Sequence, residues 1–234
     1  MNVLLVHAHP EPQSFCSAMK NQTVQWFESQ GHTVQVSDLH AMHWNPVADA
    51  SDFAERSNPD YLVYALEQRH AVKTNTLPDD IQIELNMLKA CDLLVLNFPI
   101  YWFSVPAILK GWIDRVFLSG EVYGGRNFYD RGLMKGKRAL LTFTLGGRDH
   151  MFGEAAVHGD LNTMLRPLLR GSLGYAGFDV LEPFAAYHVP YISDEARAQV
   201  MDDFDACLRH LDERAALPMP SLDNFDPQMN PLTK

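Results

Sequence analysis

Three segments of the 234-residue chain are apolar at almost every position, and this pattern constrains its fold most strongly. They are Val3–Val6, Asp92–Phe98 and Arg138–Leu145. A strand with one face in water alternates polar and apolar side chains, whereas a strand covered on both faces does not. The three segments therefore predict central strands of a parallel sheet with helices on both sides.

Two further strands and several helices are predicted between and after these segments. The strands are Thr33–Ser37 and Val180–Tyr187. Ser14, Pro106 and Ser193 stand where each residue type favours the start of a helix. The predicted helices are Ser14–Gly31, Ile81–Lys89, Pro106–Phe117, His158–Tyr175 and Ser193–Leu211.

The alternation of strands and helices, in a chain without a GxGxxG motif, predicts an α/β fold. We expect a flavodoxin-like, doubly wound, five-stranded parallel sheet in the order 2-1-3-4-5. Ligands of such sheets bind beyond the carboxyl ends of the strands, at the switch point between strands 1 and 3. Three loops should therefore converge on one ligand: His7–Phe15, Pro99–Ser104 and Leu145–Phe152.

The predicted domain bounds follow from where the apolar residues are periodic along the chain and where they are not. Residues 1–216 are predicted to form the single flavodoxin-like domain, with an irregular insertion at about 40–80 and a helical stretch around Tyr61–Arg69. From Leu217 onward four prolines and a lack of periodicity predict an extended tail over residues 217–234.

Charge and cysteine content narrow the classes of partner. The chain has 19 Lys+Arg against 29 Asp+Glu, a formal charge of −10, so nucleic acid is not expected as a partner. No apolar run approaches the roughly 20 residues that span a bilayer, and the N-terminus does not resemble a signal peptide. Cys16, Cys91 and Cys207 form no CxxC pair, so we expect reduced thiols, a cytoplasmic protein and no metal site.

The first of the three loops ends at a helix N-terminus, where unpaired N–H groups and the helix dipole attract anions. Ser14 adds a hydroxyl group and His9 a further donor. The loop suits a phosphate or pyrophosphate, and an ordinary capped turn is the alternative.

The second and third loops suit a flat ring. Tyr101, Trp102 and Phe103 are consecutive aromatics after a buried strand, and three neighbours cannot all face one core. They either line a cavity for a planar ligand or pack locally. Gly146 and Gly147 lack a Cβ, which lets a ring approach the backbone closely. His158 follows this turn and is either catalytic or structural.

Four sequence motifs resemble those of the NAD(P)H:quinone oxidoreductases of the DT-diaphorase type, a flavodoxin-like family. They are HAHPEPQSF, FPIYWFSVPAILKGWIDRVF, TLGGRDHMF and AVHGDLN, and the likeness extends from Val3 to about Arg214. The resemblance implies a homodimer with one flavin per subunit and active sites at the subunit interface. It favours FAD over the alternative FMN, with NAD(P)H as co-substrate and a quinone as electron acceptor.

The resemblance also implies roles for individual residues. His158 would be catalytic. The cofactor would contact His9, Ser14, Phe15, Cys16, Pro99, Ile100, Tyr101, Trp102, Phe103, Thr144, Leu145, Gly146, Gly147, Phe152 and Arg197. The substrate cavity would be lined by Trp102, Phe103, Tyr123, Met151, His158 and Tyr175, some of them from the partner subunit.

Several positions depart from the family pattern. Phe152 stands in place of a tyrosine beside the flavin, Cys16 in place of an asparagine, Val63 in place of a glutamine and Tyr191 in place of a cavity histidine. Without a phenol at Phe152, His158 would protonate the reduced flavin alone or through water.

The activity expected from these features is two-electron hydride transfer from NAD(P)H through the flavin to a quinone, by a ping-pong mechanism. Two alternatives stay open. One is a flavoprotein that regulates a potassium-efflux system, and the other is an azo- or nitroreductase of the same fold.

Overall fold

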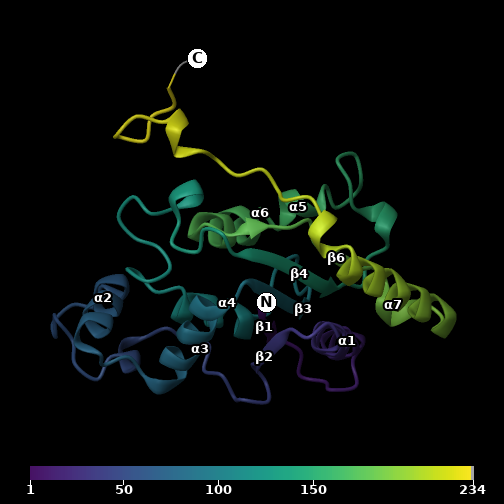
Figure 1. Ribbon diagram of the computed structural model, residues 1–234, viewed down its shortest axis with the longest axis horizontal. Helices are drawn as coiled ribbons and strands as arrows, with labels where there is room; N and C mark the ends of the chain where they lie inside the picture. Colours follow the sequence, from purple (N-terminus) through teal and green to yellow (C-terminus); the bar gives the residue numbers. More distant parts are fainter. Residues whose placement is uncertain (233–234) are drawn as a thin grey trace.

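The computed structural model of the protein, which describes residues 1–232, has a parallel sheet at its centre (Figure 1). Its strands are β1 (Asn2–His7), β2 (Thr33–Asp38), β3 (Leu93–Pro99), β4 (Arg138–Thr144), β5 (Asp179–Val180) and β6 (Phe184–Ala186). The order is β2-β1-β3-β4, with β5 and β6 both paired to β4. This confirms the predicted doubly wound α/β fold, and every residue of β3 is buried, as its composition predicted.

The outer edge of the sheet differs from the prediction in one detail. The single strand expected at Val180–Tyr187 is split into β5 and β6. Between them, the Glu182 N–H donates to the Ala215 carbonyl instead of to β4. The next residue, Pro183, has no N–H to donate to a sheet. The Leu181 N–H still donates to Ala139 of β4, so the chain leaves β4 at Glu182 and Pro183 and rejoins it at Phe184.

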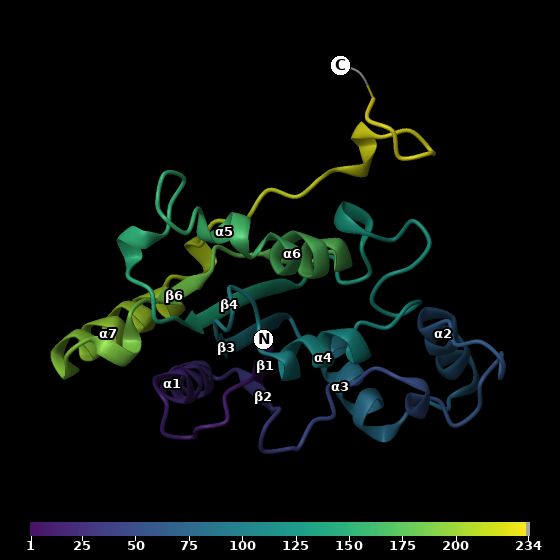
Figure 2. The ribbon, with the colours of Figure 1, turned by 180° about the vertical axis from the view of Figure 1, so that it is seen from behind.

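Helices cover both faces of the sheet, as Figures 1 and 2 show. On one face, α1 (Phe15–Ser29) and α7 (Asp194–Arg209) pack on side chains such as Leu5 and Val95. On the other face, α3 (Asp79–Ala90) and α4 (Ala107–Val116) pack on the alternate residues Leu4 and Leu94. Consecutive strand residues point to opposite faces, so each apolar run contributes to two cores.

The helix predicted over His158–Tyr175 forms in pieces. It begins at Leu161, where the Asp160 side chain accepts the Thr163 N–H, and divides into α5 (Leu161–Met164), α6 (Arg166–Leu168) and a π-helical turn over Leu169–Gly174. Pro167 lies at this break and lacks the N–H that a continuous helix needs. The helix predicted around Tyr61–Arg69 is instead α2 (Tyr64–Thr74), shifted toward the C-terminus.

A buried ion pair fastens the insertion to α4. The Arg115 side chain donates to Asp52 at 2.7 Å, and both side chains are almost fully buried. Its second terminal nitrogen donates to Asp80 and to the Asn45 carbonyl. Pro46 lies so close to Gly111 of α4 that a Cβ there would be 2.2 Å from the Pro46 carbonyl oxygen. The segment before α2 is thus held by a charge pair and by a close backbone contact.

The tail extends away from the sheet beside the loop that precedes β4 (Figure 1). Asp130 of that loop accepts the Ser221 hydroxyl at 2.7 Å and the Leu222 N–H at 3.1 Å. Apart from a short 3₁₀ turn at Leu222–Asn224, the described tail has no helix, and residues 233–234 of the predicted tail lie outside the described residues. None of the helices within residues 1–232 combines the length and apolar character that crossing a bilayer requires.

Candidate active site

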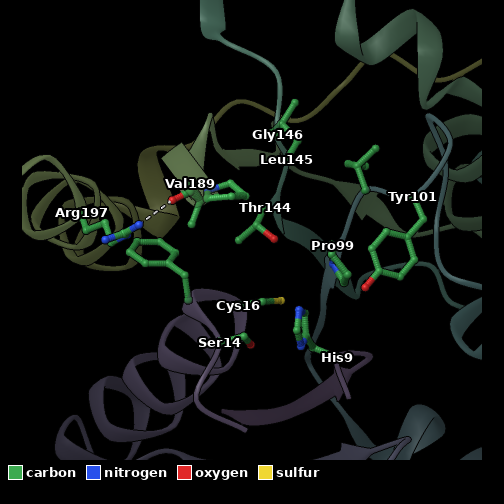
Figure 3. Close-up of a pocket in the computed structure, with 13 residues that line it drawn as sticks. His9, Ser14, Cys16, Pro99, Tyr101, Thr144, Leu145, Gly146, Val189 and Arg197 are labelled. Carbon is green, nitrogen blue, oxygen red and sulfur yellow. Dashed lines mark hydrogen bonds between the residues drawn. The ribbon is translucent and has the colours of Figure 1, made fainter. Parts of the chain in front are cut away.

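A cavity of about 370 Å³ opens at the carboxyl ends of β1, β3 and β4 (Figure 3). It lies where the three predicted loops meet, and α7 and the turn after β6 complete its wall. Its lining residues are His9, Ser14, Phe15, Cys16, Pro99, Ile100, Tyr101, Thr144, Leu145, Gly146, Val189, Pro190 and Arg197. All but Val189 and Pro190 were predicted to contact a cofactor. Those two carried no sequence signal, because they belong to the short 3₁₀ turn Val189–Tyr191, which lies outside the three loops.

The N-terminus of α1 presents hydrogen-bond donors to this cavity. The Ser14 hydroxyl oxygen caps the helix by accepting the Ser17 N–H at 3.0 Å. The N–H groups of Phe15 and Cys16 have no hydrogen-bond partner within residues 1–232. The helix start is therefore stabilised by its own serine while donors remain free for an anion.

His9 is oriented as a further donor at the same end of the cavity. Its Nδ1 accepts the Glu11 N–H at 3.0 Å, so the proton of the neutral ring sits on Nε2. Burial lowers the pKa of His9, which favours the neutral ring. His9 thus offers an N–H rather than a positive charge.

A buried polar network lies under this anion site. The His7 Nδ1 donates to the Asn97 side-chain oxygen at 2.6 Å, and its Nε2 lies 3.1 Å from the Ser17 hydroxyl. Asn97 in turn donates to Thr142 at 3.0 Å, and the Cys16 thiol lies 3.2 Å from the Asn97 oxygen. The network joins β1, β3 and β4 to the first turn of α1. Burial raises the pKa of Cys16 to about 12, so its thiol stays protonated.

The free energy of unfolding should depend on pH because His7 is buried in its neutral form. Burial lowers the pKa of His7 from 6.5 to about 4. The unfolded chain therefore binds a proton first as the pH falls, and the free energy of unfolding should decrease between about pH 6.5 and pH 4, by up to about 3 kcal/mol. Urea unfolding across this range measures the decrease.

Two variants separate this effect from the titration of carboxylates. His7→Gln keeps hydrogen-bonding atoms but does not titrate, so its stability should change less between pH 6.5 and pH 4 than that of the wild type. His43→Gln alters an exposed histidine and should retain the wild-type slope. Equal slopes for all three proteins would rule out a neutral buried His7.

The structure places two residues of the aromatic loop outside the cavity. Tyr101 and Ser104 exchange backbone hydrogen bonds of 3.0 Å, which closes a tight turn with Trp102 and Phe103 at its centre. Both central residues have positive φ, 48° and 61°, a conformation that costs a bulky residue about 1–3 kcal/mol. Trp102 is 95% exposed. Only Tyr101 of the three aromatics lines the cavity.

The glycine turn and His158 form a second cluster beside the cavity. Phe152 packs directly on Gly147, where a Cβ would be 2.7 Å from its ring. The His158 ring lies between Phe103 and Phe152, with centroid distances of 5.3 and 5.1 Å. Gly147, Phe152, Met151 and His158 therefore lie near the cavity wall without lining it.

Two predicted substrate residues lie in a different cavity of the single chain. Tyr123 and Tyr175, with ring centroids 5.9 Å apart, line a cavity of about 360 Å³ between α2, α4 and the π-helical turn. Burial raises the pKa of Tyr175, so its phenol stays protonated at neutral pH. Within one chain these tyrosines do not join the first cavity.

The one guanidinium on the cavity wall belongs to Arg197 of α7. It donates to the Asp194 carboxylate at 2.7 Å and to the Val189 carbonyl at 3.3 Å, which holds α7 against the turn after β6 (Figure 3).

These residues fit a flavin better than a metal ion. One end of the cavity offers a helix N-terminus for phosphate, and the other has a glycine backbone where a Cβ at Gly146 would meet nothing closer than 3.8 Å. Free donors and a flat, open backbone match the two ends of a flavin nucleotide. No group of three or more His, Cys, Asp or Glu residues within residues 1–232 is arranged to hold a metal.

Comparison with known proteins agrees with the fold. A family model described as flavodoxin-like fold matches residues 1–209. A ribosyldihydronicotinamide dehydrogenase (quinone) of Rattus norvegicus is 44% identical over 200 residues, covering 85% of this chain and 86% of that protein. The NAD(P)H dehydrogenase (quinone) 1 of the same species is 39% identical over 215 residues, covering 92% and 78%.

A solved structure extends the likeness to the arrangement of the whole chain. A Klebsiella pneumoniae protein described as a candidate quinone reductase superposes with a TM-score of 0.91 at 32% sequence identity. The match covers 99% of this chain and 93% of that one.

Proposed function

Because the chain belongs to the flavodoxin-like family of quinone-reducing NAD(P)H dehydrogenases and is an enzyme of that kind, we propose that it is a flavoprotein that carries two electrons from NAD(P)H to a quinone. The observation that carries the flavin proposal is the cavity at the switch point of the sheet. There a helix N-terminus, an aromatic loop and a glycine turn surround one space. We propose a ping-pong order, in which NAD(P)H and the quinone occupy the same space in turn.

We propose FAD as the cofactor, with FMN as the alternative. The free N–H groups of Phe15 and Cys16, with His9 and Ser14 beside them, would hold the phosphates. Arg197, on the α7 side of the cavity, would contact the adenylate half, which only FAD has. Pro99, Ile100, Tyr101, Thr144, Leu145 and Gly146, which line the cavity, would surround the ring, and Trp102, Phe103, Gly147 and Phe152 would approach it from beside the cavity.

The protein itself would supply a proton to the reduced ring, through His158. A bound flavin supplies the hydride chemistry. His158 would provide the proton that neutralises charge on the reduced ring, because Phe152 has no hydroxyl group. The Phe103 and Phe152 rings both contact the half-buried His158 ring and restrict its orientation.

We also propose a homodimer with the active sites at its interface. The strained, exposed turn of Trp102 and Phe103 supports this, since a partner subunit that buried the Trp102 indole would offset the strain. The partner would bring its own Tyr123, Met151 and Tyr175 toward the substrate space. Residues 1–216 would form the flavin-binding domain and 217–234 a tail, and the three buried free thiols suit the reducing cytoplasm.

Release of the bound chromophore by denaturation tests the cofactor directly. We expect a yellow purified protein whose supernatant has the absorbance spectrum and mass of FAD. FMN would correct the choice of nucleotide. A colourless protein that neither flavin reconstitutes would overturn the proposed function.

Turnover of a soluble quinone separates the enzyme from its rivals. We expect rapid reduction of menadione with NADH, NADPH or dihydronicotinamide riboside as donor. Negligible turnover by a protein that retains flavin would favour the regulator of a potassium-efflux system. Faster turnover of azo or nitro compounds than of quinones would favour the reductase alternative.

A further inference from the structure

His188 holds both carbonyl groups of the glycine turn. Its ring Nδ1 lies 2.7 Å from the Gly146 carbonyl oxygen, and its backbone N–H donates to the Gly147 carbonyl at 2.9 Å. A carbonyl oxygen can only accept, so the His188 Nδ1 carries the proton in this contact. His188, which follows β6, therefore fixes two successive peptide groups after β4.

The two contacts with His188 determine the direction of the Gly147 N–H. In a trans peptide the C=O and the following N–H point in opposite directions. Because the Gly146 carbonyl faces His188, the Gly147 N–H faces away from it. Strand β4 lies between β6 and β3, so the opposite direction leads toward the Pro99–Ser104 loop. The Gly147 N–H has no hydrogen-bond partner within residues 1–232.

The backbone conformation of His188 is unusual, and contacts with Tyr191 stabilise it. The residue has a φ of 54°, which costs a non-glycine residue free energy. The Tyr191 ring packs on the His188 ring at 4.9 Å, and Tyr191 donates its N–H to the His188 carbonyl at 2.9 Å. Phe152 closes the opposite side of the turn by packing on Gly147. The turn is held between Phe152 and the His188–Tyr191 pair.

We propose that His188 is a positioning residue that aims the Gly147 N–H at the electron-rich edge of the reduced cofactor ring. The inference rests on the proposed function. An oriented backbone donor of this kind stabilises negative charge where it develops and needs no reorganisation during the reaction. His188 does not line the cavity and would act through the glycine turn.

A matched set of variants tests this role. His188→Gly removes the ring donor and tolerates the positive φ, whereas His188→Asn tolerates the same φ and keeps an N–H donor on its side chain. His43→Gly is the control, because His43 is an exposed histidine with a φ of 53° outside the site. We expect His188→Gly to lower the midpoint potential of the bound flavin and to reduce kcat about 10²-fold. His188→Asn should recover most of both, and His43→Gly should match the wild type.

Hydrogen exchange of the flavin-free protein provides a readout besides activity. The backbone of residues 145–152 should exchange faster in His188→Gly than in the wild type, His188→Asn or His43→Gly. If the wild type binds flavin but His188→Gly leaves potential, kcat and exchange unchanged, the inference fails while the proposed function stands. If the wild type binds no flavin, both fail.

Discussion

Replacing His158 with alanine is expected to slow the reduction of the bound flavin by NAD(P)H by about 10²–10⁴-fold, the usual contribution of a positioned general acid. The ring is held between Phe103 and Phe152, and the neighbouring aromatic side chain at position 152 has no proton to substitute for it. Stopped-flow absorbance of the flavin measures the rate, and flavin content should stay near that of the wild type.

A second histidine in the same loop serves as the control for His158. His150 is exposed, and His150→Ala should leave the reduction rate unchanged. A His158→Ala protein that is reduced as fast as the wild type would remove His158 from the proposed proton transfer. Loss of flavin from His158→Ala would instead assign the residue to cofactor retention.

The largest loss of stability is expected for Arg115→Met. Methionine fills much of the space of the arginine side chain but leaves the buried Asp52 carboxylate without its ion pair. Removing one member of a buried pair costs about 3–5 kcal/mol, because the remaining charge is desolvated and unpaired. The same change also releases the Asn45 carbonyl and Asp80. Urea unfolding monitored by circular dichroism gives the free energy.

An exposed ion pair provides the comparison. Arg131 lies 2.7 Å from Asp223, and both side chains are exposed to solvent. Arg131→Met should cost no more than about 1 kcal/mol, as surface pairs do. Equal losses for Arg115→Met and Arg131→Met would show that the insertion is not anchored by the Asp52 pair. The double variant Arg115→Met/Asp52→Leu should recover part of the loss, since no charge is left buried without a partner.

The parts of the fold that were predicted correctly depend on local patterns. The apolar runs of β1, β3 and β4 identified central strands because a strand covered on both faces is apolar at most of its positions instead of at every second one. The start of α1 at Ser14 followed from the residue types that cap helices. The convergence of three loops followed from the sheet order, since the carboxyl ends of neighbouring parallel strands meet at one edge.

The parts of the structure that differ from the prediction are those where distant contacts compete with the local sequence pattern. The pattern over His158–Tyr175 is helical, but Pro167 and the packing of Met219 against Gly174 accompany a broken and π-helical path. The sequence left open whether Tyr101, Trp102 and Phe103 line a cavity or pack locally. Within the single chain only Tyr101 lines the cavity, and the backbone hydrogen bonds between Tyr101 and Ser104 close a turn that leaves Trp102 exposed.

The sequence alone therefore determined the class of fold, the edge of the sheet where the cavity opens and the family to which the chain belongs. These depend on residue types at fixed spacing along single strands, turns and motifs. Only the tertiary structure decided that Val189 and Pro190 wall the cavity, that His188 holds the glycine turn and that Arg115 pairs with Asp52. His188 and Gly146 are 42 residues apart, and Arg115 and Asp52 are 63 apart. No local pattern encodes such contacts, because they form only when the packed sheet brings distant segments together.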